Sequence, residues 1–249
     1  LLPAEGRLVL PGDTPFADRI LRRSPAPAIR VGTRAEDDWR LLAATPGVDG
    51  VTFEVRATDS RYSGLYEVPL LGRHQARNAL LALAVAAGFG LTREELQQGL
   101  ASCRPAPHRL ENWVVGGVRV LDDSYNADAD SMIAALETLR DYPCAGRRIA
   151  VLGDMGELGA SSDALHAEVG RKAAELPVDQ LFAVGRMAGV LGEAARAAGL
   201  KRTLELYDVE AMVGALTGFV RPGDVLLIKA SRTAGLERIA DHFRPRTGA

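Results

Sequence analysis

The second half of this chain alternates regularly between short apolar segments and longer segments of helical periodicity, and this alternation limits the fold more than any other feature. From Trp113 onward six segments have the composition of β-strands, and after a first hairpin a helical pattern separates each from the next. Such alternation is typical of a mostly parallel sheet with right-handed crossovers. We therefore expect an α/β fold with a Rossmann-like domain here. The expected strands are 113–115, 118–121, 148–152, 180–184, 203–206 and 224–228, and the expected helices are 131–141, 163–175, 187–198, 208–219 and 233–243.

The earlier part of the chain combines strands and helices in a less regular order. Residues 7–10 and 28–31 have the composition of strands, and a helix capped by Thr14 between them makes a β-α-β unit. The other expected elements are extended segments at 52–57 and 65–70 and helices at 74–89 and 93–101, the last with a capping box of Thr92 and Glu95. Pro105 and Pro107 then oppose any helix. We place a domain boundary there, between residues 1–106 and 107–249.

Composition excludes several classes of partner. The chain has 249 residues, 47% hydrophobic and 25% charged, and its net charge of −2 gives no reason to expect a nucleic-acid or membrane partner. The apolar run 79–87 is far shorter than the roughly 20 residues of a membrane span. Cys103 and Cys144 stand far apart, which suits a reducing cytoplasm, and the scattered histidines predict no metal site in this chain.

Neither of the two common phosphate-binding sequences is present. GxxxxGK[ST] and GxGxxG both depend on glycines that let the backbone approach phosphate oxygens, and neither occurs in the chain. Chemistry on a nucleoside triphosphate would therefore need residues that these 249 do not include.

The strand-to-helix turn at 121–132 is the richest in polar groups. Asp123, Tyr125 and Asn126 follow an expected strand, and the carboxyl ends of strands in an open α/β sheet form the crevice where ligands bind. Asp130 can cap the following helix. The structural alternative is that these side chains only make an Asx turn and a cap. Asp122 and Asp123 together exceed what capping needs, which favours a binding site.

Two more candidates lie before this turn. His74 and Asn78 are four residues apart, so both project from one face of a helix, and an Asn amide suits an adenine edge. The alternative there is a helix cap followed by a buried helix. Arg109, held beside prolines, can reach a phosphate or a ribose. A salt bridge between domains, with Glu111 or another acid, explains Arg109 equally well.

Two later loops complete the set. Asp154 lies in a glycine-rich turn after the strand at 148–152, with His166 on the helix that follows. Lys229 and Ser231 leave the last strand at a helix N-terminus, where an anion is favoured. If the sheet is parallel, all these loops open on the same edge and form one crevice.

Several motifs together resemble the Mur ligase family. The segments that carry the resemblance are GRHQARNALLALAVA at 72–86, PHRLE at 107–111, LDDSYNADADSM at 121–132, VLGDMGELG at 151–159 and LIKASRTAGLERI at 227–239. VLPGDTPF at 9–16 resembles the later part of the central ATPase domain of that family. The resemblance implies the rear part of a Mur-type central ATPase domain in residues 1–106, followed by a Rossmann-like C-terminal ligase domain in residues 107–249.

The resemblance also implies an activity. Family members are ATP-dependent amide ligases in which ATP phosphorylates a carboxylate and an amine attacks the acyl phosphate. The branch most similar to this chain takes UDP-N-acetylmuramoyl-tripeptide and D-alanyl-D-alanine in cytoplasmic peptidoglycan precursor synthesis. The family's phosphate loop, magnesium ligands and carbamylated lysine would lie upstream of Leu1, in an N-terminal part of the same enzyme, so this chain alone is expected to be inactive.

The same resemblance assigns a ligand to each candidate residue. It assigns no residue of this chain to catalysis or to a metal. ATP would require Mg²⁺ held by the upstream part. The residues expected to bind ATP are His74, Asn78, Arg109 and Asp123, and those expected to bind the dipeptide are Tyr125, Asn126, Asp154, Lys229 and Ser231.

The chain departs from the usual family pattern at several positions. Gln75 and Pro11 each replace a usual Asn, Asp128-Ala129 replaces Asn-Pro, and Ala230 replaces a Gly. Gln75 also resembles the folylpolyglutamate synthases, a sister branch. Two alternatives therefore stay open: a ligase of that type, and a non-catalytic module that binds a nucleotide or a dipeptide.

Overall fold

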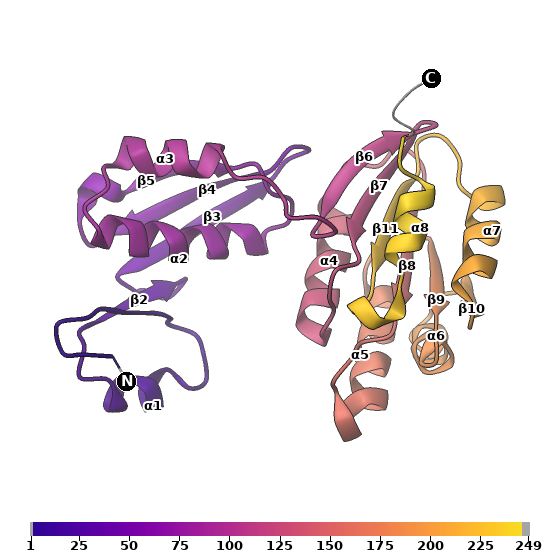
Figure 1. Cartoon of the computed structure of the whole chain (residues 1–249), viewed down its shortest axis with the longest axis horizontal. Coiled ribbons are helices and arrows are strands. Elements are labelled where there is room, and N and C mark those ends of the chain that lie inside the picture. Colours follow the sequence, from indigo (N-terminus) through magenta and orange to yellow (C-terminus); the bar gives the residue numbers. More distant parts are fainter. Residues whose placement is uncertain (1, 246–249) are drawn as a thin grey trace. The chain divides into compact units, whose positions relative to one another are not determined.

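The computed structural model describes residues 2–245, and the chain divides into two compact units at the bond between Arg104 and Pro105 (Figure 1). Each unit has its own sheet and its own apolar core. We describe each unit by itself. Among the described helices, none combines the length and the apolar character needed to cross a membrane.

The first unit is a five-stranded sheet in the order β1-β2-β3-β4-β5. β1, β2 and β3 run parallel, and β3, β4 and β5 are antiparallel. Its core lies between the sheet and two helices, with Phe53, Tyr66 and Leu80 almost fully buried. The strands are β1 (Leu8–Pro11), β2 (Ala28–Gly32), β3 (Trp39–Pro46), β4 (Val51–Ala57) and β5 (Gly64–Val68), and the helices are α1 (Ala17–Arg23), the 3-10 turn η1 (Ser60–Tyr62), α2 (His74–Gly88) and α3 (Arg93–Ala101).

Two local predictions for this unit had different outcomes, and one strand was not predicted. The capping box of Thr92 and Glu95 at the start of α3 is confirmed. The cap at Thr14 is wrong: its backbone N–H donates to the Pro11 carbonyl in a turn, and α1 begins only at Ala17. β3 was not anticipated, because its burial pattern is irregular and its register with β4 shifts after Leu41, so the sequence shows no regular alternation.

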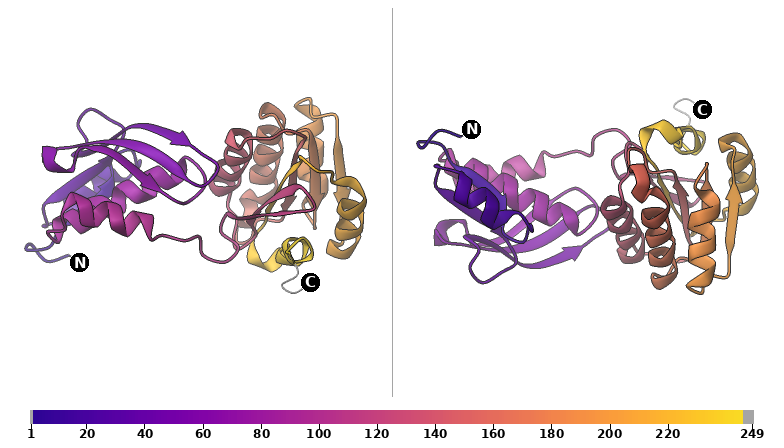
Figure 2. Two further views of the ribbon diagram at one scale, coloured as in Figure 1. Left: turned by 90° about the horizontal axis from the view of Figure 1, so that it is seen from above. Right: turned by 90° about the horizontal axis from the view of Figure 1, so that it is seen from below.

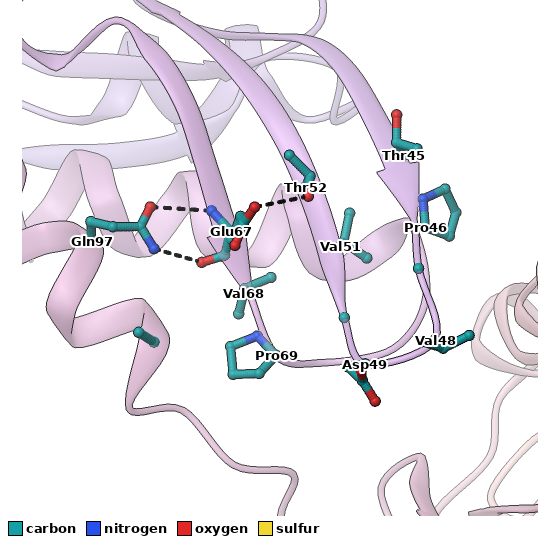
Figure 3. A pocket seen from close by; sticks show the side chains of 13 residues that line it. Thr45, Pro46, Val48, Asp49, Val51, Thr52, Glu67, Val68, Pro69 and Gln97 are labelled. Carbon is teal, nitrogen blue, oxygen red and sulfur yellow. Dashed lines mark hydrogen bonds between the residues drawn. The ribbon is translucent and has the colours of Figure 1, made fainter.

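The outer edge of β5 is covered by side chains of α3. The Gln97 amide donates to the Glu67 carbonyl and accepts from the Glu67 N–H, both at 3.1 Å, as a neighbouring strand would (Figure 3). Arg93 donates to the Leu65 carbonyl at 3.2 Å. A pocket of about 470 Å³ lies beside this edge, lined by the turn between β3 and β4, by β5 and by α3. Main-chain groups of an edge strand are thereby kept from pairing with another chain.

The second unit is a six-stranded sheet in the order β10-β9-β8-β11-β7-β6, parallel except for the β6–β7 hairpin. The predicted α/β fold with a mostly parallel sheet is confirmed. The central strands are buried on both faces, which explains their continuous apolar sequence. The strands are β6 (Glu111–Val115), β7 (Val118–Asp123), β8 (Arg148–Gly153), β9 (Gln180–Val184), β10 (Thr203–Leu206) and β11 (Val225–Lys229).

Helices cover both faces of this sheet (Figures 1 and 2). α4 (Ala129–Asp141), α5 (Ser162–Glu175) and α6 (Ala188–Ala197) lie on one face. The other face carries α7 (Val209–Phe219) and α8 (Glu237–His242). The 3-10 turns are η2 (Gly159–Ser161) and η3 (Arg232–Ala234).

Two helix starts in this unit differ from prediction. α4 is capped by Asp128, whose carboxylate accepts from the Ser131 N–H at 2.8 Å, so the predicted cap at Asp130 is wrong. The predicted helix 233–243 is divided into η3 and α8. Gly235 has φ 69°, in the left-handed region, and this conformation ends the first turn before α8 begins.

β7 and β11 create the crevice of the second unit. They are neighbours, and their last residues, Asp123 and Lys229, are partners in the register. The chain leaves β7 toward α4 on one face and leaves β11 toward α8 on the other. In an α/β sheet, adjacent strands whose connections diverge in this way leave a crevice at their carboxyl ends.

Candidate functional site

A cleft of about 420 Å³ lies at the carboxyl ends of β7 and β11. Arg109 and Tyr125 are its most prominent side chains: the guanidinium carbon of Arg109 lies 4.2 Å from the centre of the Tyr125 ring, and both residues are exposed. An Arg stacked on an aromatic ring keeps its hydrogen-bonding edge free for an anion. The cleft is lined by Ala106, Pro107, His108, Arg109, Ser124, Tyr125, Arg232 and Glu237.

A strained turn presents Arg109. His108 and Leu110, on either side of it, have φ of 59° and 51°, a left-handed conformation that is uncommon for residues other than glycine. The Arg109 N–H donates to the Ala106 carbonyl, and the Tyr125 N–H donates to the His108 carbonyl, each at 3.0 Å. Strain of this kind persists only where surrounding contacts hold it, and it is concentrated at functional sites.

Two carboxylates fix His108. Glu111 Oε2 accepts from the His108 backbone N–H at 2.9 Å and from Arg244 Nη2 at 2.6 Å. Asp122, fully buried, lies 2.8 Å from His108 Nδ1 through Oδ2 and accepts from the Ser124 hydroxyl and N–H through Oδ1. The pKa of Glu111 is lowered: partial burial raises it, but the hydrogen bonds from His108 and Arg244 outweigh burial.

These contacts bear on the structural alternative for Arg109. That alternative paired Arg109 with Glu111 or another acid, and the structure pairs Glu111 with Arg244. Arg109 instead stacks on Tyr125, which belongs to the same unit. The salt bridge between Arg109 and Glu111 is therefore wrong, and the guanidinium of Arg109 is directed to the cleft.

Asp123 and Lys229 form a buried pair at the base of the site. Lys229 is 2% exposed, and its Nζ donates to Asp123 Oδ2 at 2.6 Å and to the Asn126 carbonyl at 2.9 Å. Burial raises the pKa of Asp123, and attraction by Lys229 offsets this only in part. The Leu110 N–H also bonds to this carboxyl. The pair thus joins the strand ends to the turn that carries Arg109, while Asn126 itself is exposed.

Asp154 and Ser231 tie the neighbouring loops together. The Asp154 carboxylate accepts from the backbone N–H groups of Arg186 and Met187 at the start of α6, at 3.1 and 2.9 Å. Its carbonyl accepts from the Ser231 N–H at 2.9 Å. A Cβ on Gly185, which has φ 106°, would lie 2.8 Å from this carboxylate, so the close approach requires glycine. The Ser231 hydroxyl is buried, 3.1 Å from that of Thr233.

His166 fastens the glycine-rich loop to α5. The imidazole is fully buried; its Nε2 accepts from the Met155 N–H at 2.9 Å, and its Nδ1 lies 2.8 Å from the Ser162 carbonyl. A nitrogen facing a carbonyl must carry a hydrogen, and one facing an N–H must not. His166 is therefore a neutral Nδ1–H tautomer that holds the loop at 153–159.

His74 and Asn78 belong to the first unit and not to the residues that line the cleft. Both lie in the first turns of α2, and Asn78 is exposed, with its amide donating to Gln75 Oε1 at 3.2 Å. Beside them Arg77 forms an ion pair with Asp13 at 2.6 Å. Their role at an adenine ring stays a prediction.

One group of possible metal ligands occurs among residues 2–245. Ligand atoms of His108, Glu111 and Asp122 lie within 4.8 Å of one another. Arg244 already pairs with Glu111 and lies 3.6 Å from Asp122, so a guanidinium supplies the positive charge there. Mg²⁺ also prefers an octahedron of oxygen ligands. This group does not fit Mg²⁺.

Sequence reasoning missed several residues of the site. Arg232 lines the cleft and stands in a motif from which only Lys229 and Ser231 were selected. His108 and Asp122 also lay in recognised motifs, but no periodicity marks them as partners. Arg244 has no signal in the sequence, because it lies 133 residues from Glu111 along the chain.

Comparison with known proteins shows which family the chain resembles. Residues 1–86 match the family description "Mur ligase middle domain", and residues 108–232 match "Mur ligase, glutamate ligase domain". The UDP-N-acetylmuramoyl-tripeptide–D-alanyl-D-alanine ligase of Mycobacterium tuberculosis is 34% identical over 96% of this chain, which covers 51% of that protein. The chain thus spans about half the length of the curated relatives it matches.

Two solved structures are similar over nearly the whole chain. A crystal structure of MurF from Acinetobacter baumannii has a TM-score of 0.86 and 26% identity, covering 98% of this chain and 52% of that one. MurF from Thermotoga maritima in complex with ADP has a TM-score of 0.76 and 26% identity, covering 96% and 53%. Because the two family descriptions together match most of the chain and the mycobacterial relative is 34% identical over 96% of it, the chain belongs to the Mur ligase family.

Proposed function

We propose that this chain is the rear half of an ATP-dependent ligase that joins D-alanyl-D-alanine to UDP-N-acetylmuramoyl-tripeptide. The observation that carries the proposal is the cleft between β7 and β11, whose Arg109 and Tyr125 fall within the region matched to the ligase domain. The relative from Mycobacterium tuberculosis is named for this reaction, and its similarity extends over both units. The domain assignment follows: residues 1–106 belong to the ATP-binding domain and residues 107–249 to the ligase domain.

The proposed reaction needs charge to be neutralised and an amine to be positioned. A carboxylate of the tripeptide attacks the γ-phosphorus of ATP and releases ADP; the dipeptide amine then attacks the acyl carbon and expels phosphate. Mg²⁺ would neutralise phosphate charge when bound, and its ligands are proposed to lie outside this chain. The guanidinium of Arg109, held flat on Tyr125, suits a phosphate or a ribose oxygen.

The remaining residues fall into contact and positioning roles. Asn78, with His74, would meet the adenine ring, while Tyr125 and Asn126 are exposed enough to touch the dipeptide. Lys229, Asp154 and Ser231 have partners within the fold, so they would act on the dipeptide through the loops they hold. Asp123 would contact the ribose by its carboxyl while remaining paired with Lys229.

A cytoplasmic location also belongs to the proposal. The two cysteines, Cys103 and Cys144, are free thiols in the structure, as expected in a reducing compartment.

A chimera tests the function. Residues 1–249 would replace the corresponding rear half of the mycobacterial relative, and phosphate release would be measured with UDP-N-acetylmuramoyl-tripeptide, ATP and either D-alanyl-D-alanine or L-glutamate. We expect turnover with D-alanyl-D-alanine and not with glutamate. Asp123→Ala in the chimera should raise the KM for ATP. It should also lower the melting temperature, because it leaves the buried ammonium of Lys229 without its carboxylate partner.

Other outcomes would point elsewhere. A folded chimera that turns over glutamate favours a folylpolyglutamate-type ligase. One that binds D-alanyl-D-alanine or ADP without turnover favours a non-catalytic module. Turnover by the isolated 249-residue chain would overturn the placement of the phosphate-binding residues outside it.

A further inference from the structure

Arg244 lies just after α8, beside the first strand of the second unit. Its Nη2 donates to Glu111 Oε2 at 2.6 Å and lies 3.6 Å from Asp122 Oδ2. Its guanidinium carbon lies 4.3 Å from the centre of the Trp113 ring. Nε also donates to Asp241 at 3.2 Å. One side chain thus joins the end of α8 to both strands of the β6–β7 hairpin.

The same two carboxylates hold the turn beneath the cleft. Glu111 accepts from the backbone N–H of His108, and Asp122 bonds to the His108 ring. The His108 carbonyl accepts from the Tyr125 N–H at 3.0 Å. His108 is therefore fixed at its amide, ring and carbonyl, and the next residue in the chain is Arg109.

Electrostatics make Arg244 necessary to this arrangement. Glu111 and Asp122 converge on His108, and Asp122 is fully buried. Two negatively charged carboxylates this close repel each other unless a cation lies beside them. Arg244 is that cation. Without it, we expect Glu111 to turn toward water and release the His108 amide, and the left-handed turn would then relax.

We propose that Arg244 is a positioning residue for the cleft: through Glu111 and Asp122 it holds His108 in its left-handed conformation, so that Arg109 stays stacked on Tyr125. Its effect on ligand binding rests on the proposed contact between Arg109 and a nucleotide phosphate or ribose. Its effect on the order of the turn does not. A purely structural role at the end of α8 is already served by the Trp113 Nε1–H, which donates to the Phe243 carbonyl at 2.7 Å.

The test compares variants of the whole 249-residue chain by two measurements: hydrogen exchange of the Tyr125 amide followed by NMR, and ADP affinity by calorimetry. Arg244→Gln should speed exchange and raise the Kd for ADP by about tenfold, the size typical of losing a supporting contact. Arg244→Lys should give an exchange rate and a Kd between those of the unsubstituted chain and Arg244→Gln, because Lys keeps the positive charge but not the planar guanidinium. Arg196→Gln is the control, since Arg196 pairs with Glu205 on β10, at the edge of the sheet opposite to β6, and should change neither quantity.

A double substitution separates positioning from general destabilisation. In an Arg109→Ala background, adding Arg244→Gln should raise the Kd no further, because the group that Arg244 positions is gone. Unchanged Tyr125 exchange in Arg244→Gln would overturn the proposal, as would additive effects on the Kd. If the unsubstituted chain binds no ADP, the affinity is measured in the chimera, which supplies the proposed phosphate-binding residues. An equal Kd for ADP in the chimera with and without Arg109→Ala would refute the nucleotide role of Arg109, while Tyr125 exchange still decides whether Arg244 holds the turn.

Discussion

The Asp123–Lys229 pair illustrates how a single buried contact shapes the site. Lys229 is 2% exposed and its ammonium faces a carboxylate at 2.6 Å, so neither charge is fully solvated. Because burial raises the pKa of Asp123, its folded-state pKa exceeds the ordinary value of 3.8. The folded state therefore holds this proton more tightly than the unfolded state does. As the pH rises above 3.8 and through the folded-state pKa, the proton is released, and the stabilisation that Asp123 contributes is lost.

Removing Lys229 should increase the free-energy cost of keeping Asp123 ionised in the folded state. Lys229→Met leaves an unpaired buried carboxylate, and we expect a loss of about 3–5 kcal/mol at neutral pH, measured by urea unfolding. The loss should shrink as pH falls, because protonation of Asp123 removes the uncompensated charge. Asp123→Asn combined with Lys229→Met should recover much of the loss. A loss that does not vary with pH would contradict this account.

The pKa of Asp224 is shifted in the opposite direction to that of Asp123. Burial raises its pKa, but hydrogen bonds from the Arg147 side chain and from the backbone of Arg147 and Arg221 outweigh burial, so the pKa is lowered below 3.8. The stability that Asp224 contributes is complete above the ordinary value and is lost as pH falls through the lower folded value. Asp224→Asn should cost about 2–3 kcal/mol at neutral pH.

The measurement is urea unfolding at a series of pH values. The difference between the unsubstituted chain and Asp224→Asn should narrow at acidic pH. Glu175→Gln, in an exposed pair with Lys172, is the control and should show no such narrowing. If the difference in unfolding free energy between the two chains does not change with pH, the ionisation of Asp224 does not account for the effect.

At the scale of the element, α3 protects the exposed edge of its sheet. Gln97 makes two hydrogen bonds to Glu67, in the positions that a further strand would occupy. The edge also exposes 64% of Leu65. An apolar edge strand with free main-chain groups is prone to pair with another chain.

Removing the Gln97 amide should therefore increase self-association. We expect Gln97→Ala to form dimers or larger species at concentrations where the unsubstituted chain does not, as measured by light scattering after size-exclusion chromatography. Gln98→Ala is the matched control, because Gln98 is exposed on the same helix. If both variants behave like the parent chain, the Gln97 amide is not what protects the edge.

At the scale of the whole molecule, the chain has two apolar cores, one in each unit. One packs β3, β4 and β5 against α2 and α3, and the other packs the central strands of the second sheet against α7 and α8. Every residue that lines the cleft lies after Pro105. The cleft is thus a property of the second unit.

The second unit should therefore fold without the first. We expect residues 105–249 to unfold in one cooperative transition and to retain the Trp113 fluorescence of the whole chain, because the contacts of Trp113 with Phe243 and Arg244 are internal to that unit. Loss of cooperative unfolding would show that the first unit contributes to the core of the second.

The sequence by itself determined the features that depend on near neighbours. Apolar periodicity predicted the strands and helices of the second unit, and a Thr and a Glu three residues apart predicted the cap of α3. Tertiary structure decided which polar groups are partners. Asp123 and Lys229 are 106 residues apart, and Glu111 and Arg244 are 133 apart. No local pattern encodes such pairings, because they arise only when the sheet brings strand ends into register and burial removes the water that would otherwise solvate each charge.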